Sequence, residues 1–244
     1  MIPSTNKRHT NDVPVAADGT VARETFGACR TGSLALAQRG QETAPDGKKT
    51  MKYYKAINPI SKLPKNTLCF NETKNIDDSE MLKINYDADF RFDDIIKISV
   101  DKDPKIKEYK EFDFNLSNSG IQIVSEYFKD IIGDNDITFF EIETINYKTK
   151  RKYYVMKINK FYDCVDEAKS EIRYWTKENT NIKERVGKYE NLMKFVIDDN
   201  KVGEAKIFRL KKYFPAIIIR DDLREKIIKN KITGIDFIDT WELK

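Results

Sequence analysis

The sequence predicts an α+β fold: a single domain, residues 51–244, with a mainly antiparallel sheet and a few packed helices. Three observations predict this fold. Short apolar or alternating runs recur between polar turns, which is typical of antiparallel strands. Two segments show helical spacing behind capping side chains. The 244 residues are 40% hydrophobic, which is sufficient for a core without disulfide bonds.

Residues 1–50 differ in composition from the rest of the chain. They hold half of the 10 glycines and one isoleucine, Ile2, whereas the later residues are rich in Lys, Ile, Asn, Tyr and Phe. Met51 reads like a natural start. We therefore predict that residues 1–50 are a disordered upstream extension, from a misassigned start or an added segment. The alternative is a regulatory or targeting arm.

The sequence of the first half of the domain predicts two strands. Residues 51–56 suit a strand, and Pro59 and Pro64 mark the loop that follows. Residues 71–78 are polar and are expected to be irregular. Residues 95–100 (I-I-K-I-S-V) predict the second strand, which ends at the turn D-K-D-P.

A helix and a hairpin are predicted next. Ser117 to Ser119 offer capping oxygens, Gly133 ends the run, and the apolar positions between them have helical spacing: Ile121, Val124, Phe128, Ile131 and Ile132. Residues 139–145 alternate like a half-buried strand, and residues 153–158 are expected to be its hairpin partner.

Residues 178–189 are polar and lysine-rich, and we interpret them as a surface loop or a frayed helix. A further hairpin is predicted from residues 195–197 and 205–210. Its turn, D-D-N-K-V-G, ends at Gly203, from which we expect an unusual backbone angle.

The C-terminal segment predicts an apolar strand, a helix and a closing strand. Residues 216–219 are the apolar run, and the helix is expected to begin at Asp221 or Asp222, whose carboxylates suit the cap and the helix dipole. Lys229 and Lys231 complement its C-terminal end, and its predicted apolar face is Leu223, Ile227 and Ile228. Gly234 opens the last strand, residues 235–238.

Charge and cysteine content exclude several function classes. Lys and Arg number 44 against 40 Asp and Glu, and their interleaving is typical of a solvated surface and disfavours nucleic-acid binding. The best local basic group is Lys206, Arg209, Lys211 and Lys212. Three cysteines without ligand spacing, Cys29, Cys69 and Cys164, argue against disulfide bonds and zinc.

No apolar run approaches the length of a membrane span, and the first residues lack a signal peptide. We therefore expect a cytoplasmic protein that does not bind membranes. The one histidine, His9, lies in the extension, so a folded domain without it has no imidazole for catalysis or metal binding.

One pattern suggests enzymatic chemistry. Asp198 or Asp199 followed by Glu204 and Lys206 resembles the acidic pair and lysine of restriction-type nucleases, which would bind Mg²⁺. Such triplets arise by chance in a chain rich in Glu and Lys. Asp163, Asp166 and Glu167 also form an acidic group, but their spacing matches no Ca²⁺-binding loop and suits a turn.

Phosphate loops, nucleophile elbows and a histidine base for the cysteines are missing from residues 51–244. We therefore predict no enzyme, metal or cofactor, and favour a binding or inhibitory module. A metal-dependent nuclease using Asp198, Glu204 and Lys206 and a nucleic-acid-binding regulator are the alternatives.

Two stretches resemble a known family. Residues 153–170, with D-C-V-D-E-A-K-S, are similar to the D-C-x-D-x-x-x-S signature of an immunity-protein family from bacterial polymorphic toxin systems. Residues 207–210, 217–227 and 232–237 are similar to that family's ending, which closes on a T-G-x-x-F strand. Arg220 stands where that family has a small capping hydroxyl residue, and we expect Asp221 to cap instead.

The resemblance implies a cytoplasmic protein that binds and neutralises a cognate toxin domain. Its motifs suit strands, a cap and a turn glycine, so they identify the fold rather than the toxin-binding surface. Exposed aromatic side chains would anchor such an interface. The candidates are Tyr174, Trp175, Tyr189 and Trp241.

Overall fold

The computed structural model of the chain describes residues 51–87, 89–133 and 136–240. Residues 1–50, with the predicted extension, His9 and Cys29, lie outside the described residues, as does Trp241. The described residues form two larger sheets, a two-stranded ribbon and three short α-helices, and this arrangement confirms the predicted α+β class.

One larger sheet has five strands in the order β13-β1-β12-β11-β8. All its neighbours are antiparallel except β8 and β11. Its strands are β1 (Tyr53–Ile57), β8 (Phe161–Tyr162), β11 (Ile207–Leu210), β12 (Tyr213–Arg220) and β13 (Asp236–Asp239).

The other sheet has six strands in the order β2-β3-β6-β7-β5-β4, of which only β3 and β6 pair in parallel. Its strands are β2 (Phe70–Thr73), β3 (Ile96–Val100), β4 (Phe114–Leu116), β5 (Gln122–Ser125), β6 (Ile137–Thr144) and β7 (Tyr153–Ile158). The predicted hairpin of residues 139–145 and 153–158 is confirmed as β6 and β7.

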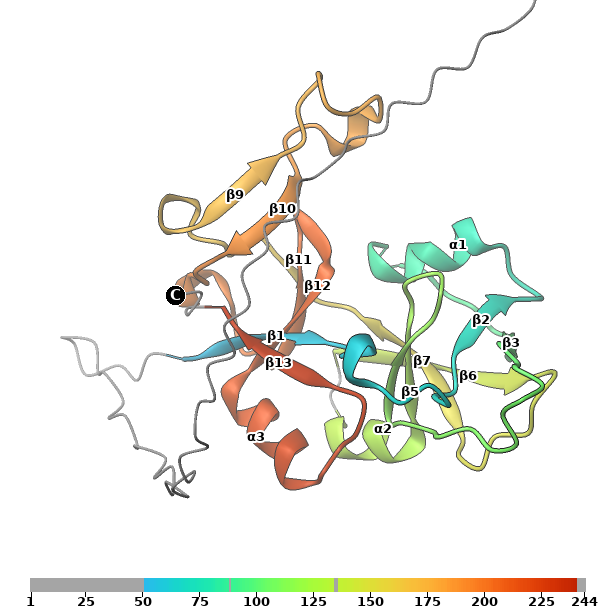
Figure 1. Cartoon of the computed structure of the whole chain (residues 1–244). Helices are drawn as coiled ribbons and strands as arrows, with labels where there is room; N and C mark the ends of the chain where they lie inside the picture. Colours follow the sequence, from blue (N-terminus) through green and yellow to red (C-terminus); the bar gives the residue numbers. More distant parts are fainter. Residues whose placement is uncertain (1–50, 88, 134–135, 241–244) are drawn as a thin grey trace, which may run out of the picture. The chain divides into compact units, whose positions relative to one another are not determined.

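The two sheets share a buried cluster that α2 (Glu126–Ile132) and α3 (Asp221–Lys229) complete. Figure 1 shows α3 under β1 and β13 and α2 under β5, and the two helices contact each other. The short helix α1 (Asp78–Leu82) packs on the six-stranded sheet, where Met81 is fully buried.

A buried arginine also joins the two sheets. Arg209 of β11 is 1% exposed, and its guanidinium donates to the side-chain oxygens of Asn85 (2.8 Å) and Gln122 and to the backbone oxygen of Phe214. Burial lowers the pKa of Arg209 to about 10. The basic group of Lys206, Arg209, Lys211 and Lys212 is therefore no continuous surface patch, because Arg209 lies inside the protein.

Thr233 and Gly234 of the C-terminal motif pack against β4 and the residue before it. The Thr233 hydroxyl and amide donate to the Asp113 carboxylate at 2.6 and 3.0 Å, and the Ser125 hydroxyl donates to it at 2.8 Å. Gly234 has a φ of +83°, and a Cβ there would lie 2.3 Å from the backbone oxygen of Phe114. Only glycine allows this close approach.

The predicted helix over residues 117–133 is wrong in its first half. Gln122–Ser125 is strand β5, paired on one side with β4 and on the other with β7. Because every residue of β5 is buried, its apolar positions lack the alternation that marks a strand. The cap is the hydroxyl of Ser125, which accepts from the Phe128 amide, and Gly133 ends the helix at φ +49° as predicted.

Two further predictions are wrong. Residues 71–73 are the greater part of β2 and are not irregular. Residues 195–197 do not pair with residues 205–210, because β11 pairs with β8 and β12, and Ile197 bridges to Val165. Gly203 is not among the described residues with positive φ.

Helix α3 begins at Asp221 as predicted, but no side chain caps it. Arg220 occupies the cap position, and its guanidinium binds both carboxylate oxygens of Asp222. Leu223 and Ile227 are buried as predicted, whereas Ile228 is 51% exposed.

Candidate functional site

A two-stranded ribbon stands apart from both larger sheets. It consists of β9 (Glu171–Tyr174) and β10 (Tyr189–Lys194), which pair antiparallel and are joined by a distal loop, residues 175–188. Figure 1 shows the ribbon in orange, beside the end of β11 and β12. We call residues 171–194 the arm.

A carboxylate fixes the base of the arm. Glu167, within the D-C-V-D-E-A-K-S segment, accepts hydrogen bonds from the hydroxyls of Tyr174 (2.9 Å) and Tyr189 (2.8 Å) and from the ammonium of Lys212 (2.7 Å). The hydrogen bond from Lys212, with those from the two tyrosines, lowers the pKa of Glu167 to about 2. One side chain thus ties both strands of the arm to the turn between β11 and β12.

Packing and backbone contacts add to this attachment. Tyr189 and Leu192 are buried in the cluster that also contains Cys164 and Phe208. The Tyr189 amide donates to the backbone oxygen of Lys212 at 3.1 Å, and the rings of Tyr174 and Tyr189 meet edge to face at 5.6 Å. The arm is therefore a fixed element rather than a loose hairpin.

The remaining side chains of the signature segment hold this base in place. Cys164 is buried, and burial raises the pKa of its thiol to about 12. The Asp166 amide donates to the backbone oxygen of Val196, and the Ser170 hydroxyl bridges the Asp166 oxygen (2.6 Å) and the Val196 amide (3.0 Å). The segment is thus a structural support for the arm.

The arm presents apolar side chains to solvent. Four of its large apolar or aromatic residues are at least a third exposed: Tyr174 (37%), Ile182 (40%), Val186 (38%) and Met193 (57%). The guanidinium of Arg185 lies 5.5 Å from the ring of half-buried Trp175. Exposed apolar and aromatic groups on one element are typical of a protein-binding surface.

The aromatic residues predicted as interface anchors differ in their exposure. Tyr174 is exposed, Trp175 is half-buried, and Tyr189 is buried and therefore wrong as an exposed anchor. Trp241 lies outside the described residues. Ile182 and Val186 were missed because residues 178–189 are polar and lysine-rich. Met193 was missed because the register shifts of β10 place its buried Tyr189 and Leu192 three residues apart, which hides the alternation of a strand.

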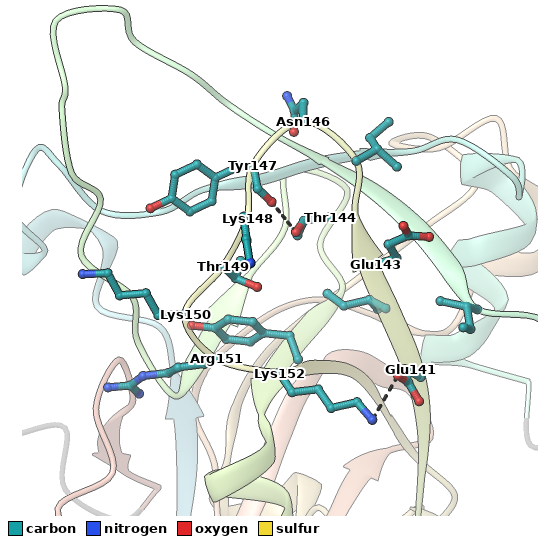
Figure 2. A pocket seen from close by; sticks show the side chains of 14 residues that line it. Glu141, Glu143, Thr144, Asn146, Tyr147, Lys148, Thr149, Lys150, Arg151 and Lys152 are labelled. Carbon is teal, nitrogen blue, oxygen red and sulfur yellow. Dashed lines mark hydrogen bonds and ion pairs between the residues drawn. The ribbon is translucent and has the colours of Figure 1, made fainter.

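A polar pocket at the turn between β6 and β7 offers a second surface. Figure 2 shows Lys152 reaching Glu141, with which it pairs at 3.0 Å, and the Thr144 hydroxyl directed at the backbone oxygen of Tyr147. Two more cations in the lining are paired with carboxylates: Lys150 with Glu108 and Arg151 with Asp113. Because three of the four cations in the lining are compensated and the fourth, Lys148, stands alone among the described residues, we assign no anion site to the pocket.

The predicted nuclease residues do not form a cluster. Asp198 pairs with Lys201 (3.4 Å), and Lys206 pairs with Asp222 (3.8 Å), while the Glu204 side chain is exposed. Asp163 pairs with Lys212 (3.4 Å), and Asp166 pairs with Lys169 (2.8 Å). Among the described residues, no three His, Cys, Asp or Glu side chains form a group that could hold a metal ion.

A family model described as "Immunity protein family (Imm11)" matches residues 45–242, a range that contains both motifs and the whole arm. No curated protein matches the chain. None of the helices in residues 51–87, 89–133 and 136–240 is both long and apolar enough to cross a membrane.

Proposed function

The chain belongs to the Imm11 immunity protein family, and on this premise we propose that it binds and neutralises a cognate bacterial toxin domain in the cytoplasm. The proposed mechanism is stoichiometric binding, without a metal, a cofactor or a chemical step. The arm is the proposed contact surface.

One observation supports the arm above other surfaces: exposed apolar side chains stand on a ribbon whose base is fixed by Glu167. A standard protein interface buries about 800 Å² per partner around a few anchoring side chains. A fixed arm meets that requirement at low entropic cost, because little of it needs to become ordered on binding.

The test is co-expression with the toxin domain encoded by the neighbouring gene. We expect that cells producing both proteins survive and that the two proteins co-purify in a 1:1 ratio. Protection of the cells without physical association of the two proteins would disprove the binding mechanism.

The arm itself is tested by Met193→Asp combined with Ile182→Asp, which replaces two exposed apolar groups by charges. The matched control is Ile145→Asp combined with Leu116→Asp, at exposed apolar positions on other elements. We expect the arm variant to lose co-purification and the control to keep it. Retention of the complex by the arm variant would exclude the arm as the contact surface.

A further inference from the structure

The distal loop of the arm, residues 175–188, has an excess of uncompensated positive charge. It contains four cations, Lys177, Lys183, Arg185 and Lys188, and two carboxylates, Glu178 and Glu184. Within the described residues none of the four cations forms an ion pair with a carboxylate. The cations of the two strands differ in this respect, since Arg173 pairs with Glu190 and Lys194 pairs with Glu171.

The loop has a defined conformation despite its polarity. At its neck, the Trp175 amide donates to the Lys188 oxygen and the Gly187 amide donates to the Trp175 oxygen, both at 2.9 Å. The Asn179 side chain accepts from the Thr176 amide (2.7 Å) and donates to Glu190 (3.1 Å). The four cations are therefore displayed on an ordered loop.

Apolar groups lie among these cations. Ile182 and Val186 are 40% and 38% exposed, and they flank the single 3₁₀ turn Lys183–Arg185. A surface of this kind is complementary to a protein face that has carboxylates around an apolar depression.

Resting on the function proposed above, we propose that the distal loop docks on an acidic face of the toxin domain. Lys183 and Arg185 steer the encounter, and Ile182 and Val186 enter the apolar centre of the contact. Nucleic acid fits this loop less well, because the exposed aliphatic groups Ile182 and Val186 would gain nothing from contact with a charged phosphate backbone.

The experiment measures association rates of the full chain with the toxin domain encoded by the neighbouring gene, at low and high salt. We expect the double variant K183E/R185E to associate at least about tenfold more slowly at low salt, with the difference shrinking at high salt. The variant I182A/V186A should instead dissociate faster, by about tenfold or more, at an unchanged association rate.

The matched control is K105E/K107E, which makes the same charge change at exposed lysines in the loop between β3 and β4. It should associate like the unaltered protein. Thermal unfolding of all variants checks that each one is folded. All the substituted residues are exposed, and none of the substituted cations forms an ion pair among the described residues.

The outcomes are distinguishable. If the unaltered protein does not bind the toxin domain, the proposed function fails and the docking surface fails with it. If the toxin binds but K183E/R185E and the control associate equally fast, the docking surface alone is wrong. Binding of a single-stranded RNA oligonucleotide that K183E/R185E abolishes, without an effect on the toxin, would reassign the loop to nucleic acid.

Discussion

The carboxylate of Glu167 accepts a hydrogen bond from the hydroxyl of Tyr189 at 2.8 Å, and this contact joins the turn after β8 to the first residue of β10. Residues 22 positions apart in the sequence thus fix one end of the arm. The same carboxylate binds Tyr174 and Lys212, so its loss should loosen the arm before it affects either larger sheet.

The first prediction concerns acid sensitivity of the arm. The pKa of Glu167 is lowered from 4.5 to about 2, so the stabilisation it provides is complete above about pH 4.5 and is lost as the pH falls toward 2. The effect is modest because Glu167 is 40% exposed. The protection factors of the β9 and β10 amides, which correct for the intrinsic pH dependence of hydrogen exchange, should fall over this range in the unaltered protein.

In Glu167→Gln the protection factors of the arm should be lower already at pH 6, and their dependence on pH between 4.5 and 2 should flatten. Glu171→Gln, which removes one surface ion pair with Lys194, is the control and should leave exchange close to that of the unaltered protein. Equal exchange in the two variants would show that Glu167 does not hold the arm.

The second prediction compares two glycines with nearly the same backbone angle. Gly234 and Gly187 have φ of +83° and +81°, but a Cβ would meet the Phe114 oxygen at 2.3 Å in the first case and nothing within 4 Å in the second. We expect Gly187→Ala to cost about 1–2 kcal/mol in the free energy of unfolding, from backbone conformation alone.

Gly234→Ala should cost several times as much, or prevent folding, because the steric conflict is with backbone that cannot move away. Urea denaturation of both variants gives the comparison. Similar urea midpoints for the two variants would contradict the close approach of Gly234 to the backbone oxygen of Phe114.

A third prediction concerns the buried Arg209. Arg209→Met removes the donor to Asn85, Gln122 and the Phe214 oxygen, and leaving these acceptors without partners should cost about 3 kcal/mol in urea denaturation. Arg173→Met, at an exposed arginine that forms one ion pair, should cost less than about 1 kcal/mol.

The double variant Arg209→Met with Gln122→Leu should recover part of the loss, because it removes one of the stranded acceptors. A double variant less stable than Arg209→Met alone would indicate that Gln122 stabilises β5 through packing rather than through Arg209.

The fourth prediction concerns Thr233 and the pKa of Asp113. Burial alone would raise that pKa, but hydrogen bonds from Thr233 and Ser125 and the charge of Arg151 together lower it. Asp113 therefore stabilises the fold above its ordinary pKa, and this contribution is lost as the pH falls through the lowered value.

Thr233→Val should cost about 1–2 kcal/mol at neutral pH and raise the Asp113 pKa, so that acid unfolding begins at higher pH. Thr149→Val, at a half-buried threonine near the turn between β6 and β7, is the control. The Asp113 carboxyl can be titrated by NMR, and an unchanged pKa in Thr233→Val would contradict the assignment.

Several elements could be predicted from local sequence. The strands β1, β3, β6, β7 and β12 and the helix α3 follow from apolar runs, alternation and turn residues that act over a few positions. The T-G-x-x-F and D-C-x-D-x-x-x-S segments lie within residues 45–242, which the family model matches. Their side chains proved to support the fold, with Gly234 and Ser170 as the clearest cases.

Other elements depended on partners distant in sequence. Strand β5 has the apolar spacing of a helix, and it is a strand because β4 and β7 flank it on both sides. The arm had no local signal, since β9 and β10 are paired across a polar loop and are held by Glu167 and Lys212. In the lysine-rich group, Arg209 is buried because Asn85 and Gln122 accept its hydrogen bonds.

The sequence by itself therefore determined the α+β class, the family and the approximate positions of the locally encoded elements. Only the tertiary structure decided which tyrosine of the arm is exposed, which arginine is buried and where unpaired charge is displayed. The physical reason is that secondary structure follows from interactions over a few residues, whereas exposure and charge compensation are set by residues that folding brings together from distant parts of the chain.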